Sequence, residues 1–211
     1  MQLDSEKAYH LIKEKIITLE LAPSSVIDEH TLMEDLGLGR TPIREALRRL
    51  AAENLVNVIP RRGTFVADIR ITDLQGIFEV RMVLAGFCAR LAAQRIGRDQ
   101  IAHMGSVLER LERLEELQNG NPKALMVVDR RFQRLLYQAA DNRFLADTLN
   151  QLYDLSLRMW YLVLDRLGGV EYAIEQHWGV LDALKAGDED RAETLIRQHI
   201  AQFQQRIKSV L

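Results

Sequence analysis

The sequence predicts a mainly α-helical fold that holds one short two-stranded sheet in its first third. The only strand-like alternation, VNVIPRRGTFVADI, lies in that third, as do three of the four prolines. From Thr72 onward, apolar residues recur with helical spacing almost to the end of the chain. The 211 residues are 47% hydrophobic and 27% charged, a balance typical of globular domains. We therefore expect two domains, residues 1–70 and residues 71–211.

Three helices and two strands are expected in the first domain. LAPSS ends the first helix, and Gly37 can adopt the positive φ that a tight turn between the second and third helices requires. Pro42 falls in the first turn of the third helix, where its missing N–H costs little. The expected elements are helices over 5–19, 29–36 and 40–54 and strands over 56–59 and 64–67.

Six helices are expected in the second domain, which predicts an all-α bundle. Their breaks fall at Gly97 and at the pairs or runs NGNP, DN, GG and GD. Thr72, Asp99 and Asp188 stand where residues that cap helix starts are expected. The expected ranges are 72–97, 99–118, 122–140, 142–167, 170–186 and 188–210.

The totals exclude several classes of protein. The formal net charge of −2 excludes a nucleic-acid footprint spread over the whole surface, so any such footprint is local. Cys88 is the single cysteine, which excludes an internal disulfide and a thiolate zinc site. The sequence shows neither a signal peptide nor a run long enough to span a bilayer, so we expect a cytoplasmic protein without a membrane partner.

The third helix carries an arginine edge. Arg40, Arg44 and Arg48 are spaced four residues apart, so they lie along one face while apolar residues occupy another. A solvated helix face would show the same pattern. However, a helix, a tight turn and a basic helix form a helix-turn-helix, whose second helix enters the major groove of DNA by its N-terminal residues. The following strand pair, with Arg62 and Gly63 at its tip, would be a basic wing that reaches the backbone or minor groove.

The stretch TLMEDLGLGRTPIREALRRLAAENLVNVIPRRGTFV closely resembles the DNA-binding domain of the GntR family of bacterial transcriptional regulators. The resemblance covers about the first 70 residues. It implies a winged helix-turn-helix in which Arg40, Thr41, Arg44 and Arg48 meet DNA from the recognition helix and Gly63 and its neighbours meet it from the wing. Gly39 departs from the pattern, because the family often has a helix-capping serine there.

The second domain resembles the FadR subfamily, whose all-helical ligand-binding domain is called FCD. The matching segments are ITDLQGIFEVRMVL, DRRFQRLLYQAADNRFL and HWGVLDALKAGDEDRAETLIRQH, which cover most of residues 70–200. The resemblance implies a dimerising domain that senses organic acids or sugar acids. It also implies that Arg81 points into the ligand cavity and clamps a carboxylate; an interhelical arginine is the alternative. Arg158 is a weaker candidate of the same kind.

A metal site is suggested by both spacing and resemblance. His177 precedes Gly187 by about ten residues and His199 follows Asp188 by about eleven, so the two imidazoles fall at nearly the same height of a helix hairpin. Asp129 lies one helical turn before Gln133. The family pattern places histidine at position 133, and an amide oxygen is a weaker ligand for Zn²⁺, Ni²⁺ or Mn²⁺. Metal binding could be lost or weakened, or the carboxylate of an effector could complete the site. Gln133 could instead hydrogen-bond that effector.

The predicted function is sequence-specific transcriptional regulation. A homodimer would bind a short inverted repeat in double-stranded DNA, most simply as a repressor released by a small carboxylate effector. One alternative is a metal-dependent enzyme that activates water on Asp129, His177 and His199. Another is an RNA-binding or protein-binding module built on a winged helix, although the basic face lacks the stacking aromatics of single-stranded RNA readers.

Overall fold

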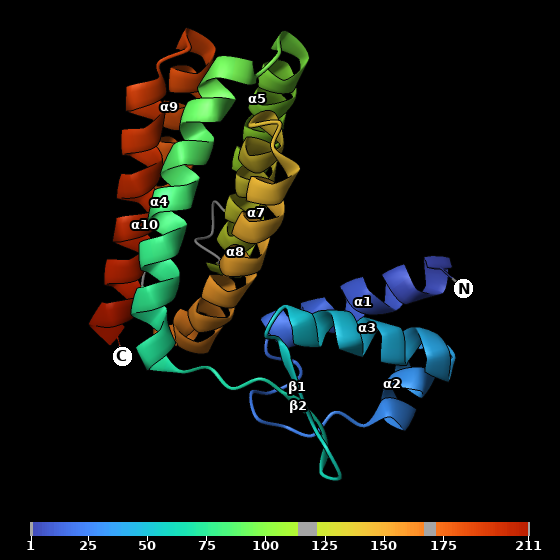
Figure 1. Ribbon diagram of the computed structural model, residues 1–211. Coiled ribbons are helices and arrows are strands. Elements are labelled where there is room, and N and C mark those ends of the chain that lie inside the picture. Colours follow the sequence, from blue (N-terminus) through green and yellow to red (C-terminus); the bar gives the residue numbers. More distant parts are fainter. Residues whose placement is uncertain (1, 114–121, 167–171, 211) are drawn as a thin grey trace. The chain divides into compact units, whose positions relative to one another are not determined.

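The computed structural model describes residues 2–113, 122–166 and 172–210. The chain divides into two compact units, one of residues 1–73 with 157–162 and the other of residues 74–156 with 163–211. The predicted fold class is confirmed, with a winged helix-turn-helix in the first unit and helices alone in the described part of the second (Figure 1).

The winged helix-turn-helix is built on one apolar core. Its helices are α1 (Gln2–Ile17), α2 (Glu29–Leu36) and α3 (Arg40–Ala52), followed by strands β1 (Val56–Ile59) and β2 (Gly63–Val66). Ile12 and Ile16 of α1 are fully buried, as are Ile43 and Leu50 of α3. Because the apolar face of α3 turns toward α1, its arginines are left on the surface.

The turn between α2 and α3 follows the predicted chemistry. Asp28 caps α2 by accepting a hydrogen bond from the backbone N–H of Thr31 at 2.8 Å. Gly37 ends the helix with φ 63°, the left-handed conformation that glycine adopts without steric cost. Gly39 is the N-cap of α3 and has no side chain to cap it. The first N–H groups of α3 are therefore left for another partner.

The wing is a tight antiparallel hairpin with one additional contact that the sequence did not reveal. Val56 pairs with Val66 and Ile59 with Gly63, so the hairpin ends at Arg61 and Arg62. Residues 24–27 run along the other side of β2, where the N–H of Ile27 donates to the carbonyl of Thr64 at 2.8 Å. This third segment ties the wing to the loop after α1.

The second unit holds the six predicted helices. Figure 1 shows them running alongside one another with their axes nearly aligned. Three expected helix boundaries, the ends at residues 118 and 167 and the start at residue 170, lie outside the described residues. The observed helices are α4 (Ile71–Arg95), α5 (Arg98–Glu112), α7 (Pro122–Ala139), α8 (Arg143–Val163), α9 (Tyr172–Ala186) and α10 (Glu189–Val210).

Two of the three predicted helix caps are wrong. Asp188 does cap α10, accepting from the N–H of Arg191 at 3.0 Å. By contrast, α4 begins at Ile71 and α5 at Arg98, so Thr72 and Asp99 lie inside the first turns. At α5 the side chain of Gln100 reaches back to the N–H of Gly97 at 3.0 Å. A longer side chain from inside the helix therefore satisfies a donor that a cap would otherwise meet.

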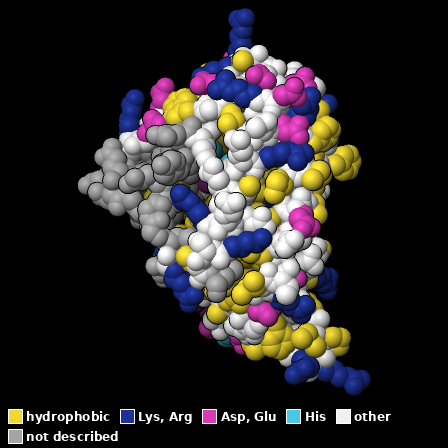
Figure 2. Space-filling view, turned by 90° about the vertical axis from the view of Figure 1, so that its left-hand side faces the viewer, with side chains coloured by type: hydrophobic (Ala, Val, Ile, Leu, Met, Phe, Trp, Pro, Cys, Tyr) yellow, Lys and Arg dark blue, Asp and Glu magenta, His cyan; other side chains and the backbone are white. Residues whose placement is uncertain are grey.

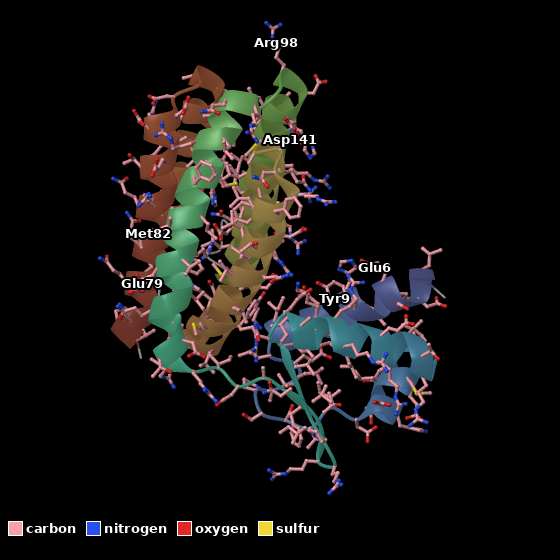
Figure 3. All side chains as sticks on the ribbon, in the orientation of Figure 1. Glu6, Tyr9, Glu79, Met82, Arg98 and Asp141 are labelled. Atoms are coloured by element: carbon pink, nitrogen blue, oxygen red, sulfur yellow. The ribbon has the colours of Figure 1, made fainter. Side chains whose placement is uncertain are left out.

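Helices α9 and α10 form a hairpin at Gly187, which has φ 66°. Basic, acidic and hydrophobic side chains all occur over the described part of the face that Figure 2 shows. Arg90 of α4 pairs with Glu189, Asp190 and Glu193 of α10. Side chains fill the interior between α4 and the opposite helices (Figure 3). No described helix combines the length and hydropathy that crossing a membrane requires.

Candidate functional site

The arginine edge of α3 is open to solvent. Arg40, Thr41, Arg44 and Arg48 are all exposed, as are Arg62 and Gly63 of the wing. The side chains of Arg40 and Arg44 are 66% and 48% exposed. Guanidinium groups in such positions can bridge guanine O6 and N7 or hold a phosphate with two hydrogen bonds.

Glu29, the first residue of α2, holds two of these arginines. Its carboxylate accepts from Arg44 Nε at 2.8 Å and lies 3.6 Å from Arg40 Nε. The acid therefore orients the two cations and partly neutralises them before any ligand binds. Sequence periodicity could not reveal this contact, because Glu29 and Arg44 lie on different helices.

Arg49 of α3 has a structural partner instead. Its guanidinium lies 3.9 Å from the centre of the Tyr9 ring and donates to Glu6 at 2.6 Å, and both of these residues belong to α1. Glu6 and Tyr9 are marked in Figure 3. Lys13 adds a buried ion pair with Glu53 at 2.7 Å. These contacts fix α1 against α3, so Arg49 belongs to the helix packing rather than to the exposed edge.

The wing tip presents its cations from a strained turn. Arg61 has φ 63°, an uncommon conformation for a residue with a side chain, and Gly63 has φ 113°. The N–H of Arg62 closes the turn by donating to the carbonyl of Ile59 at 3.0 Å. Two exposed arginines thus stand next to backbone that carries no side chain at Gly63.

The second unit encloses a buried polar cluster. Asp129 of α7, His177 of α9 and His199 of α10 are 1%, 1% and 5% exposed, and their ligand atoms lie within 4.8 Å of one another. His177 Nε2 is 3.0 Å from Asp129 Oδ1. The structure therefore brings together the three residues that the sequence selected, and the two imidazoles do share one height of the hairpin.

The electrostatics of the cluster favour an ionised carboxylate. Burial alone would raise the pKa of Asp129, but the neighbouring His199 and His177 outweigh it and hold that pKa well below the usual range. Burial lowers the pKa of His177, against the opposing effect of Asp129. A carboxylate beside two imidazoles is a typical donor set for Zn²⁺, Ni²⁺ or Mn²⁺.

His199 approaches the same carboxylate without a hydrogen bond. Its Nε2 lies 2.9 Å from Asp129 Oδ1, yet this atom makes no hydrogen bond to any residue that the structure describes. A buried nitrogen near a carboxylate, in a geometry unsuited to hydrogen bonding, fits an ion held by both atoms. The residues present thus fit a divalent metal, and Asp129, His177 and His199 would hold it.

Three further buried groups near Asp129 lack protein partners. Gln133 is fully buried and, among the described residues, has no hydrogen-bond partner for either amide atom; the same holds for Nε and Nη1 of Arg81 and for the hydroxyl of Tyr137. Each unsatisfied buried polar group costs about 1–3 kcal/mol. A polar ligand that met these atoms together would therefore stabilise the cluster.

Aromatic side chains shape the surroundings of Arg81. Its guanidinium lies 4.7 Å from the ring centre of Tyr153 and 5.9 Å from those of Phe78 and Phe203. The Tyr153 hydroxyl donates to Asp129 Oδ2 at 2.7 Å and so links this arginine pocket to the carboxylate. Burial raises the pKa of Tyr137 to about 12, so its hydroxyl stays protonated and can donate.

Arg158, the weaker effector candidate, is placed elsewhere. It belongs to the first unit, where its Nη2 donates to the backbone carbonyl of Ala67 at 2.6 Å. Burial lowers its pKa to about 10, so it remains charged. The described contacts therefore give Arg158 a backbone partner, while Arg81 and Gln133 share the second unit with the Asp–His cluster.

Comparison with known proteins identifies the family of the chain. Residues 4–66 match the model of bacterial regulatory proteins of the gntR family, and residues 76–202 match that of the FCD domain. The chain belongs to the GntR family. Membership in this family indicates a DNA-binding transcription regulator and not an enzyme, so the metal-dependent enzyme is not favoured.

Similar proteins support membership in the GntR family over nearly the full length of the chain. The HTH-type transcriptional repressor RspR of Escherichia coli is 24% identical over 98% of this chain and 90% of its own length. The repressor GlaR of the same organism is 29% identical over 95% and 94%. The structure of E. coli McbR/YncC matches with a TM-score of 0.87 at 22% identity, over 98% of this chain and 97% of that one. The last comparison shows that this GntR-family chain shares the whole McbR fold.

Proposed function

We propose that this GntR-family regulator is a homodimeric repressor, that residues 1–70 bind operator DNA, and that residues 71–211 bind a small organic acid or sugar acid that releases it. The names of RspR and GlaR support repression. In this proposal each protomer reads one half-site of an inverted repeat, with half-sites about one helical turn apart.

The observation that carries the DNA-binding part is the exposed edge of α3. Arg40, Thr41 and Arg44 in its N-terminal half face solvent, as does Arg48 one turn further on, and the opposite face of the helix is buried. The recognition helix of a helix-turn-helix reads bases with this part. Arg62 and Gly63 would meet the backbone or minor groove next to it.

The effector part is supported by the unpartnered groups around Arg81. An acid bound there would receive the guanidinium on its carboxylate and the Gln133 amide or Tyr137 hydroxyl on another oxygen. We assign Arg158 only a secondary role, since its guanidinium already has a backbone partner. A buried arginine that meets its anion in this way would discriminate strongly against uncharged analogues.

The metal part is supported by the donor set Asp129, His177 and His199. A divalent ion there would supply a fixed positive charge for the effector's carboxylate. Gln133 stands where the family pattern has a histidine, so three side chains rather than four would hold the ion, and one position would stay open to the effector.

Release of the operator requires coupling between the effector site and the DNA-binding surface. The effector would favour an arrangement of the two winged helices whose spacing no longer fits the operator. A coupling free energy of about 1–3 kcal/mol, or about 5–150-fold in affinity, is enough for such a switch.

The proposal is tested by binding. A duplex selected from random sequence or from the genome should be retained specifically at low salt, and a panel of small carboxylates should include one that reverses retention. The same panel is assayed for turnover. Consumption of an acid by the purified protein, without sequence-specific retention of DNA, would contradict the proposal and favour the enzyme.

A further inference from the structure

Two glutamines form a hydrogen-bonded chain behind His199. Gln176 of α9 donates from Nε2 to Oε1 of Gln202 on α10 at 2.6 Å. The amide oxygen of Gln176 lies 2.9 Å from His199 Nδ1. Neither glutamine belongs to the ligand set that the sequence suggested, and Gln176 directly precedes His177 in the chain.

The direction of this chain fixes the tautomer of His199. Because the amide nitrogen of Gln176 is used on Gln202, its oxygen is the atom turned toward the imidazole. An amide oxygen only accepts hydrogen bonds, so the proton of the ring sits on Nδ1. In the neutral imidazole the lone pair is then on Nε2, the nitrogen next to Asp129 Oδ1.

The Nε2 lone pair is also aimed correctly for an ion. Nε2 and Asp129 Oδ1 are 2.9 Å apart but lack hydrogen-bond geometry, so the lone pair points beside the oxygen rather than at it. Two acceptor atoms side by side repel unless a cation lies between them. Metal-bound histidines typically donate their other ring N–H to an outer partner, which fixes the ring and raises the ligand's basicity.

His177 lacks such a partner. Its Nε2 lies within hydrogen-bond distance of Asp129 Oδ1, and within the described ranges no residue meets its Nδ1. The two histidines therefore differ: Nδ1 of His199 has a hydrogen-bond partner in Gln176, whereas Nδ1 of His177 has none among the described residues.

We infer that Gln176, supported by Gln202, is a positioning residue that presents His199 Nε2 to a divalent metal ion. The inference rests on the proposed metal site and adds the residues that tune its affinity. The hydrogen bonds between Gln202 and Gln176 and between Gln176 and His199 run between α10 and α9. They therefore also couple the position of the His199 ring to the spacing of the α9–α10 hairpin.

The first test measures metal affinity in the full-length protein. Gln176→Leu keeps the size of the side chain and removes the acceptor, and we expect it to weaken Zn²⁺ or Ni²⁺ binding by about 10–100-fold in calorimetry. Gln176→Glu keeps an acceptor for the Nδ1–H and should restore affinity to within a few-fold of wild type. Gln205→Leu, at an exposed glutamine of α10, is the control and should leave affinity unchanged.

The second test needs no metal. In the metal-free protein, ¹⁵N chemical shifts of the imidazole should report His199 as the Nδ1–H tautomer, and Gln176→Leu should shift the population toward Nε2–H. Circular dichroism and the melting temperature establish that each variant folds.

The outcomes separate this inference from the function proposed above. A wild-type protein that binds neither ion overturns the metal site and with it the positioning role, whatever the tautomer. A wild-type protein that binds an ion, together with a Gln176→Leu variant of equal affinity or with His199 in the Nε2–H form, overturns the inference while leaving the metal site in place.

Discussion

Glu29 is the acid in contact with the exposed arginines of α3. It bonds to Arg44 at 2.8 Å and approaches Arg40 at 3.6 Å, so these guanidinium groups are oriented before DNA binds. Orientation lowers the conformational entropy that the side chains lose on docking, and the negative charge opposes loose attachment to phosphate. Both effects favour specific over non-specific binding.

We expect Glu29→Gln to reduce specificity more than affinity. Non-specific binding should strengthen several-fold as the acid is removed, while binding to a selected operator strengthens less or weakens. The measurement is the ratio of the two dissociation constants at one salt concentration. Glu34→Gln, at an exposed acid of the same helix, is the control; equal ratios for both variants would contradict the role of Glu29.

The metal cluster predicts a ligand-dependent stability. Protein purified without chelator should contain Zn²⁺ or Ni²⁺, and an ion at about 100 times its Kd adds about 2.7 kcal/mol to the free energy of unfolding. For a chain of this size that corresponds to a rise in Tm of roughly 5–10 °C. Asp129→Asn should abolish most of this rise. Elemental analysis that finds no metal, with no thermal shift on adding either ion, would remove the metal site from the account.

The buried arginine predicts an effector-specific defect. Arg81→Met replaces a buried guanidinium, whose Nε and Nη1 have no hydrogen-bond partner among the described residues, with an apolar side chain. We therefore expect a folded protein that binds its operator but no longer responds to the acid. Tyr137→Phe should weaken the response about fivefold, the loss of one neutral hydrogen bond of about 1 kcal/mol. Titration of the acid against the DNA complex distinguishes these variants. Normal release from Arg81→Met would place the effector elsewhere.

Residues that depend on spacing along one element were predictable, and those that depend on contacts across elements were not. His177 and His199 were placed together because helical rise fixes heights in a hairpin, and Asp129 was added by the resemblance to the FCD pattern. Tyr137, Tyr153 and Gln176 were missed, because a tyrosine or glutamine on an amphipathic helix carries no signal until its partner on another helix is placed.

At the scale of elements, replacing Gly37 or Gly76 with alanine should change the stability of the protein in opposite directions. Gly37 ends α2 with positive φ, whereas Gly76 lies in the exposed interior of α4 with no heavy atom within 4 Å of an added Cβ in the described structure. Replacing the first with alanine forces a side chain into the left-handed region, and replacing the second removes the flexibility of the unfolded chain.

We therefore expect Gly37→Ala to destabilise the protein by about 1 kcal/mol and Gly76→Ala to stabilise it by about 0.5–1 kcal/mol. Chemical denaturation of the two variants beside wild type measures both changes. Opposite signs are the essential result. A stabilising Gly37→Ala would mean that the turn before α3 does not have the conformation described.

The hydrophobic periodicity predicted the helices correctly, but it predicted the ends of the helices less accurately. The six α-helices that the structure describes in the second unit were predicted, yet Thr72 and Asp99 proved to lie inside helices rather than to cap them. A cap depends on which of several polar side chains near a helix start reaches the free N–H groups. At α5 that side chain is Gln100, which can reach back three residues. The bridge of residues 24–27 to β2 is likewise a contact between distant segments.

At the scale of the whole molecule, the proposed DNA contacts lie on an exposed basic edge of one unit and the proposed acid site lies in the buried core of the other. The low net charge means that DNA affinity comes from a local footprint, which will weaken steeply with salt as phosphate contacts are lost. A two-fold homodimer would double that footprint and make the operator an inverted repeat.

The most direct test of the account is a footprint of the wild-type protein and of Arg44→Ala on a selected operator, with the oligomeric state of both measured in parallel. The wild-type protein should protect an inverted repeat with half-sites about one helical turn apart. The Arg44→Ala variant should remain a folded dimer and protect no specific sequence. Normal protection by Arg44→Ala would contradict the assignment of α3 as the recognition helix.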